Sequence, residues 1–293
     1  MPLLGRSMKV WVAASLTSLF LFNTYWVAKS YENFFGYLFQ VPPGYAYVNM
    51  LGLVFWTGHI GLTARFVALT LGLVAVFLLW SKNWPFKKVK TIVAAALLLE
   101  GVNFLGLLPS TWWMLRADSF VYSPALGIGY LLQVLFTTPL LWVLAAKVIR
   151  YDETLGGGSL WKWAGFAFVG YMVALFVNEV SRWVGMISID NIAFLVQGIR
   201  AVGFLNAVVV MPLAVIFAVA GAYFLIKQHK DSAMKWLGAS LATAGLHYTL
   251  YIVYSYFANS LNYALLVDIW TIPLLGLGIT LLVNARQMRS FGH

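Results

Sequence analysis

Residues 203–226 read GFLNAVVVMPLAVIFAVAGAYFLI, and Lys227 follows them directly. The stretch contains no charged residue, and it is long enough to cross the hydrocarbon core of a bilayer as a helix, which takes about 20 residues. Similar apolar segments recur along the chain, at roughly 9–28, 61–81, 90–109, 122–146, 162–183, 235–257 and 264–285. The sequence therefore predicts an all-α, polytopic membrane bundle of eight transmembrane helices.

The composition of the whole chain agrees with a lipid environment. Of its 293 residues, 62% are hydrophobic and only 10% are charged, whereas soluble domains carry roughly 25% charged residues. A single globular core of this length could not bury so much apolar surface. The chain has no cysteine, which excludes disulfides, thiolate metal ligands and cysteine nucleophiles.

The basic residues predict the orientation of the chain. Five clusters lie at alternate ends of the predicted spans, and together they hold fourteen cations against Asp152, Glu153 and Asp231. The rest of the chain holds five cations against six acidic residues. Short cytoplasmic loops collect Lys and Arg, so we expect both termini in the cytoplasm of a multi-pass protein of the plasma or cytoplasmic membrane. The net charge of +10 does not indicate nucleic acid, because the cations lie at span ends.

The chain is predicted to form a single transmembrane domain, residues 1–293, that divides into possible halves at 1–152 and 160–293. The triple glycine Gly156-Gly157-Gly158 lies at this midpoint and is typical of a linker. Three spans contain a proline followed by leucine and an apolar run toward a cation, at Pro139, Pro212 and Pro273. This pattern indicates repeated helical hairpins, although chance resemblance between leucine-rich helices is the alternative. Each proline is expected to kink or loosen its helix.

Two outer loops are rich in aromatic residues. Within the first, from 29 to 60, the part from 47 onward is apolar enough to form a short interfacial helix before the second span begins. The loop from 183 to 200 has the same character. The Tyr and Trp residues are interpreted as interfacial belt residues.

A few polar residues inside the spans are the candidate site. Glu100 lies at the middle of the third predicted span, and a carboxylate facing lipid there would cost at least about 2.5 kcal/mol. Asn103 lies one turn away on the same face and can hydrogen-bond to it. Gln133 and His247 occupy similar depths in the fourth and seventh spans, and Tyr251 continues the polar face of His247.

Further polar residues lie in the outer halves of the spans. Glu179 and Arg182 are three residues apart and can form an ion pair on one helix face. The others in these outer halves are Asn23, Arg65, Asn178, Asn206 and Asp268.

Two interpretations of this polar set are open. In the first, it lines an outward-facing cavity with Glu100 and His247 at its floor and with Asp268, Glu179 and Arg182 near its mouth. In the second, each polar residue bonds to a neighbouring helix and holds the bundle together. The Glu179 and Arg182 pair fits the second interpretation better.

No cofactor is predicted. His59 and His247 lie at different depths, which disfavours bis-histidine haem ligation, and no metal site, hydrolase motif or phosphate loop is present. The leading hypothesis is therefore a carrier or channel-like protein for a small solute or ion. The alternative is a non-catalytic membrane anchor or accessory subunit of a larger, respiratory-type complex that contacts quinone or lipid. An enzyme ranks below both, because no nucleophile and base occur at usable spacing. The expected partners are the lipid bilayer, a small solute or ion, and either further copies of this chain or the other subunits of a membrane complex. Nucleic acid is not an expected partner.

Overall fold

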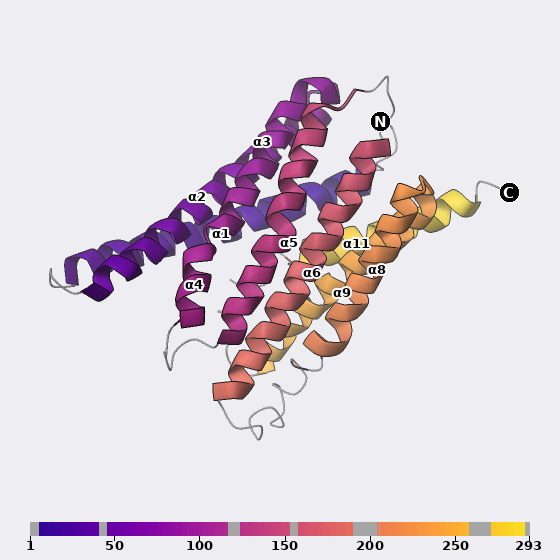
Figure 1. Ribbon diagram of the computed structural model, residues 1–293. Helices are drawn as coiled ribbons and strands as arrows, with labels where there is room; N and C mark the ends of the chain where they lie inside the picture. Colours follow the sequence, from indigo (N-terminus) through magenta and orange to yellow (C-terminus); the bar gives the residue numbers. More distant parts are fainter. Residues whose placement is uncertain are drawn as a thin grey trace.

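The computed structural model describes residues 6–40, 46–116, 124–152, 158–189, 204, 206–257 and 271–290. Throughout this part of the chain the regular structure is helical (Figure 1). The elements are α1 (Arg6–Gln40), α2 (Ala46–Trp80), α3 (Phe86–Leu105), α4 (Leu108–Arg116), α5 (Pro124–Ile149), α6 (Gly158–Ile189), the π-helix η3 (Asn206–Val210), α8 (Met211–Ile226), α9 (Lys230–Phe257) and α11 (Thr271–Ser290). The predicted all-α bundle is confirmed.

Five of these helices are long and apolar enough to cross a membrane. Their apolar segments are Lys9–Lys29, Thr57–Trp80, Gly127–Ile149, Ser159–Ser181 and Ala207–Ile226, and a shorter apolar helix covers Thr271–Ala285. These are the helices of a multi-pass membrane protein. The spans predicted at 90–109, 235–257 and 264–285 correspond to α3, α9 and α11, which do not reach the same length and hydropathy within the described residues. The count of eight spans therefore stays a prediction.

The long helices pack in chain order. Each of α1, α2, α3, α5, α6, α8, α9 and α11 contacts the next, and α11 contacts α1. The bundle is thereby closed, with α1 and α11 on its far side in Figure 1. Helices that follow one another in the sequence are therefore also neighbours in space. Most contacts between helices are accordingly made within antiparallel hairpins.

Two hairpin turns use the same device. Asn83 between α2 and α3 has φ 50°, and Gln228 between α8 and α9 has φ 60°. A residue in this left-handed conformation commonly ends a helix and lets following N–H groups bond back to its last carbonyls. The bonds from Trp84 N to Leu78 O (3.0 Å) and from His229 N to Phe224 O (2.9 Å) do this here. The two turns lie toward the upper end of the bundle in Figure 1, and both are flanked by lysines.

The first two helices are longer than the sequence predicts. Each has 35 residues, which corresponds to roughly 52 Å at 1.5 Å per residue. The prediction of a separate interfacial helix at 47–60 is wrong, because residues 46–80 form one uninterrupted helix. The physical reason is that propagating a formed helix is easier than nucleating a second one, and no proline interrupts this segment. Most of the other aromatic loop, 183–200, lies outside the described residues.

The three span prolines occupy three different settings. Pro139 lies inside the continuous helix α5. Pro212 is the second residue of α8, directly after the π-helix η3, where the wider turn leaves the backbone loosely bonded. Pro273 is the third described residue of α11.

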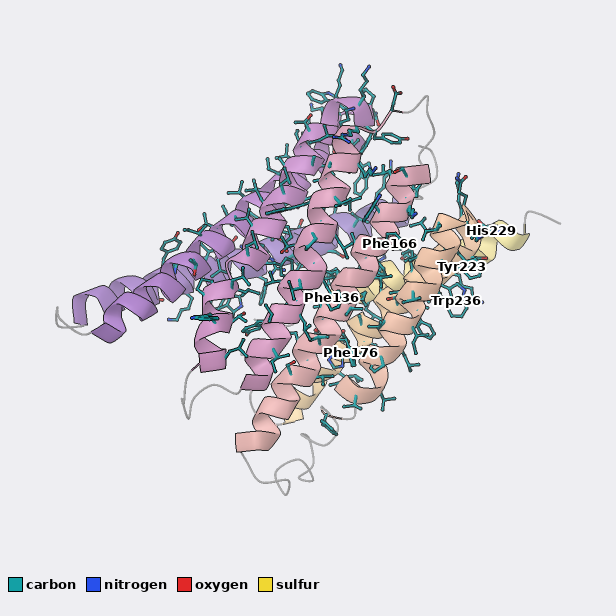
Figure 2. All side chains as sticks on the ribbon, viewed as in Figure 1. Phe136, Phe166, Phe176, Tyr223, His229 and Trp236 are labelled. Atoms are coloured by element: carbon teal, nitrogen blue, oxygen red, sulfur yellow. The ribbon has the colours of Figure 1, made fainter. Side chains whose placement is uncertain are left out.

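The outward faces carry large apolar side chains. Examples are Ile60, Val67 and Val74 on α2, with exposed fractions of 58%, 39% and 41%, and Leu135 on α5 at 58%. Figure 2 labels Tyr223, His229 and Trp236 close to the end of α8 and start of α9, where Lys235 Nζ lies 5.2 Å from the Trp236 ring centroid. This arrangement of aromatic rings beside lysines suits a membrane interface.

The α2 and α3 backbones come unusually close near the end of α3. A Cβ atom on Gly106 would lie 2.7 Å from Thr57 O and 3.0 Å from Gly61 Cα. Glycine at both positions is therefore what allows the contact, and it fixes the register of the α2–α3 hairpin.

Candidate functional site

The α2–α3 hairpin places Arg65 and Glu100 at the same depth. Arg65 lies fifteen residues before Trp80, the last residue of α2, and Glu100 lies fourteen residues after Phe86, the first of α3. At 1.5 Å per residue both lie roughly 21–23 Å from the turn.

The two side chains form an ion pair. Arg65 Nε lies 3.6 Å from Glu100 Oε1, and the side chains are 24% and 20% exposed. The separation is longer than a hydrogen bond, so this is a loose electrostatic contact. Opposite charges at this distance inside a bundle neutralise one another and avoid the cost of presenting either charge to lipid.

Both residues lie away from the lipid-facing stripes of their helices. Arg65 is two positions from Val67, and Glu100 is two positions from Leu98, which is 41% exposed. Two positions on a helix with 3.6 residues per turn correspond to about 160° of separation. The side chains of Arg65 and Glu100 therefore leave α2 and α3 on the inward side.

A tyrosine from a third helix completes this cluster. Tyr171 of α6 lies close enough to the Arg65 guanidinium to interact with it electrostatically. Its ring packs edge-on against Phe104 of α3, with centroids 6.5 Å apart, and it borders the apolar cluster formed by Phe104, Val134 and Leu141. We call Arg65, Glu100 and Tyr171 the arginine cluster.

A second contact between ionisable side chains joins α6 to α9. Glu179 Oε2 lies 3.9 Å from His247 Nε2, and these side chains are 5% and 0% exposed. Tyr248 donates a hydrogen bond of 3.3 Å from its hydroxyl to Glu179 Oε1, and its ring packs edge-on against His247 at 4.7 Å. We call Glu179, His247 and Tyr248 the histidine cluster. Unlike the arginine cluster, it is fully enclosed by protein.

Glu100 and His247, which the first interpretation places at one floor, therefore belong to two different clusters. Asn103 and Gln133 are partly buried on α3 and α5, and Gln133 lies about 160° from the exposed Leu135. Asn23 is buried, and its Nδ2 donates to Leu62 O at 3.3 Å.

The side chains of four predicted site residues fall outside the part of the chain that the structure describes. The side chains of Arg182, Asn206 and Tyr251 lie outside the described residues, as does all of Asp268. The proposed Glu179 and Arg182 pair therefore stays a prediction, whereas the described contacts of Glu179 are with α9.

Sequence reasoning named Arg65 only as an outer polar residue and did not identify Tyr171 or Tyr248. The sequence does contain a signal for Arg65. In a hairpin centred near Asn83, two residues lie at equal depth when their numbers sum to about 165, as those of Arg65 and Glu100 do. No comparable signal exists for Tyr171 or Tyr248, because the helices that they join, α6 with α2 and α9 with α6, are not consecutive in the sequence.

Histidine placement bears on cofactor binding. His59 of α2 is buried and packs edge-on against Tyr31 of α1 at 4.7 Å, whereas His247 lies on α9 in the histidine cluster. Within the described residues, no group of three or more His, Asp or Glu side chains is positioned to hold a metal ion.

Comparison with known proteins adds no functional assignment. No protein-family model matches the chain, and searches of curated proteins and of solved structures found no match.

Proposed function

We propose that the protein is a carrier or channel-like protein for a small solute or ion, with the arginine cluster lining its polar interior. The observation that supports this most is the Arg65–Glu100 pair, which lies on inward faces and yet keeps about a fifth to a quarter of each side chain exposed. An ionisable residue within a membrane bundle commonly marks a solute or ion pathway.

Stability alone gives little reason to keep such a pair. Replacing a buried ion pair by packed apolar residues is often neutral or stabilising, and each charge costs roughly 2.5–3.5 kcal/mol at a helix centre. A purely structural pair would also be expected to close tightly, whereas the Nε–Oε1 separation here is 3.6 Å. The geometry fits a pair that exchanges partners.

The proposal includes a topology of eight spans with both termini in the cytoplasm. This orientation follows from the basic clusters at alternate span ends. It places the α2–α3 and α8–α9 turns on the cytoplasmic side and the arginine cluster in the outer half of the membrane.

Water access can be tested without knowing the solute, because the chain lacks cysteine. Asn103→Cys and Gln133→Cys would place thiols on inward faces, whereas Leu98→Cys and Leu135→Cys would place matched thiols on lipid-facing stripes of the same helices. We expect a membrane-impermeant methanethiosulfonate ammonium reagent to modify the first two in proteoliposomes and to spare the second two. Equal protection of all four thiols would contradict a polar pathway.

Transport itself can be measured by stopped-flow light scattering of proteoliposomes, which reports entry of any osmotically active solute. With a panel of small cations, anions, zwitterions and neutral polyols, we expect faster re-swelling for at least one class than in empty liposomes. Glu100→Gln should reduce that rate by about tenfold or more, which corresponds to losing one charge-assisted contact. Rates equal to those of empty liposomes for the whole panel would favour the accessory-subunit alternative.

A further inference from the structure

We infer that the arginine cluster binds a small zwitterion, a solute that carries one ammonium group and one carboxylate. This inference rests on the proposed function and specifies its substrate class. It follows from the charge balance of the cluster, from its looseness and from its position relative to the histidine cluster.

The Arg65–Glu100 pair leaves hydrogen-bonding capacity unused. Arg65 Nε is buried and has no hydrogen-bond partner within the described residues, and its contact with Glu100 at 3.6 Å is electrostatic. A guanidinium offers five N–H donors in a fork that fits a carboxylate, and a glutamate offers two acceptor oxygens that fit an ammonium. Each member of the pair can therefore recognise one end of a zwitterion.

Charge balance selects against the simpler ions. The pair is neutral as a whole, so binding a lone cation or a lone anion would leave one net charge in a low-dielectric interior, which is unfavourable. A zwitterion adds no net charge. It replaces one loose ion pair by two new ones, one at Arg65 and one at Glu100, and thereby compensates for separating the original partners.

The residues around the Arg65–Glu100 pair limit where a solute can lie and favour a small solute. On the α2–α3 side, the glycine contact at Gly61 and Gly106 brings the two backbones together four to six positions beyond the pair, so a solute cannot pass between these helices there. Tyr171 of α6 lies beside Arg65 on the inward side of the pair, and its hydroxyl can bond to a bound carboxylate.

The histidine cluster is a poorer candidate for the same solute. Its Glu179 and His247 side chains are 5% and 0% exposed, and Glu179 already accepts a hydrogen bond from Tyr248. Of the two clusters, only the arginine cluster combines opposite charges with exposed surface.

The test measures thermal unfolding of the full chain in lipid nanodiscs with three matched probe sets. The sets are alanine with ethylammonium and propionate, leucine with 3-methylbutylammonium and 4-methylpentanoate, and phenylalanine with phenethylammonium and 3-phenylpropionate. A ligand at about tenfold its Kd should raise the midpoint by roughly 2–4 °C. We expect at least one amino acid to do so while its amine and its acid do not. Equal shifts within every set, or no shift with any amino acid, would overturn the inference.

Charge variants sharpen the test. Glu100→Gln leaves Arg65 alone and should transfer the shift from the amino acid to the matched acid, whereas Arg65→Gln should transfer it to the matched amine. If a single variant fails to fold, the double variant R65Q/E100Q, which keeps neutrality and shape, should fold and show no shift with any probe. A retained amino-acid shift in the double variant would exclude this cluster as the site.

Glu32→Gln is the matched control, because Glu32 forms an exposed pair with Lys29 at 2.9 Å far from the cluster along the chain. It should leave all shifts unchanged. The outcome is separable from that of the proposed function. Modification of Gln133→Cys together with absent amino-acid shifts would overturn the zwitterion alone, whereas protection of every thiol would overturn the pathway.

Discussion

Tyr171 and Glu179 lie eight residues apart on α6, and Tyr171 belongs to the arginine cluster whereas Glu179 belongs to the histidine cluster. Tyr171 is a partner of Arg65 on α2, whereas Glu179 contacts His247 and Tyr248 on α9. Eight residues correspond to roughly 12 Å along the helix. Since α6 lies between α5 and α8 in the bundle (Figure 1), it is the element through which the two clusters can influence one another.

The Arg65–Glu100 contact predicts energetic coupling between the two residues. Arg65→Gln and Glu100→Gln should each destabilise the protein, because each leaves one uncompensated charge inside the bundle. The double variant should be less destabilised than the sum of the singles, with a coupling energy of about 0.5–3 kcal/mol. Reversible unfolding in mixed detergent micelles measures all four proteins, and strictly additive effects would show that the pair does not interact.

The close approach of α2 and α3 predicts strong sensitivity at Gly106. Gly106→Ala would push a methyl group against the backbone at Thr57 and Gly61, so the helices must separate. Overpacking of this kind typically costs about 1–3 kcal/mol. Gly58→Ala is the matched control on α2, because nothing lies within 4 Å of its Cβ position. The thermal midpoint of Gly58→Ala should equal or exceed that of the wild type. Equal decreases of the midpoint in both variants would contradict close packing at Gly106.

The buried hydroxyl of Ser240 on α9 forms a hydrogen bond between helices whose contribution to stability can be measured. This hydroxyl donates to Ala214 O of α8 at 2.7 Å and is completely buried. Ser240→Ala should therefore lower the free energy of unfolding by about 0.6–1.7 kcal/mol. Thr249 donates to Gly245 O of its own helix at 2.7 Å, so Thr249→Val removes a hydroxyl without breaking an interhelical bond. We expect the serine variant to lose more stability, and the reverse order would contradict this.

The basic clusters predict sidedness, and the cysteine-free chain makes it measurable. Lys82→Cys and Lys227→Cys lie at the exposed ends of α2 and α8, whereas Trp112→Cys lies on α4, where the native side chain is 51% exposed. In intact cells an impermeant maleimide should modify only the α4 thiol, because the proposed topology places the other two in the cytoplasm. After permeabilisation it should modify all three. Labelling of the first two in intact cells would reverse the proposed topology.

Much of the helical framework could be predicted from the sequence. Apolar stretches of about 20 residues predict helices because lipid cannot hydrogen-bond to the backbone, and the helices α5, α6 and α9 cover the spans predicted at 122–146, 162–183 and 235–257 closely. The helix ends were predicted less well. The extension of α1 to Gln40 and the start of α2 at Ala46 lie in segments whose mixed composition does not distinguish a helix from a loop.

The candidate site was predicted only as a set of residues. Glu100, His247 and Glu179 were recognisable because a charged or polar residue inside an apolar span is expensive. Their pairings were not predicted, since hydropathy and hairpin position give depth, as for Arg65 and Glu100, but do not give the rotation of each helix about its axis.

Taken by itself, the sequence determined that this chain forms apolar helices and which ionisable residues they carry, because both follow from local composition. The tertiary structure alone decided that Glu100 faces Arg65 while Glu179 faces His247. The physical reason is that these pairings depend on helix rotation and register, which are set by contacts such as Gly61 against Gly106 between backbones that are distant in the sequence.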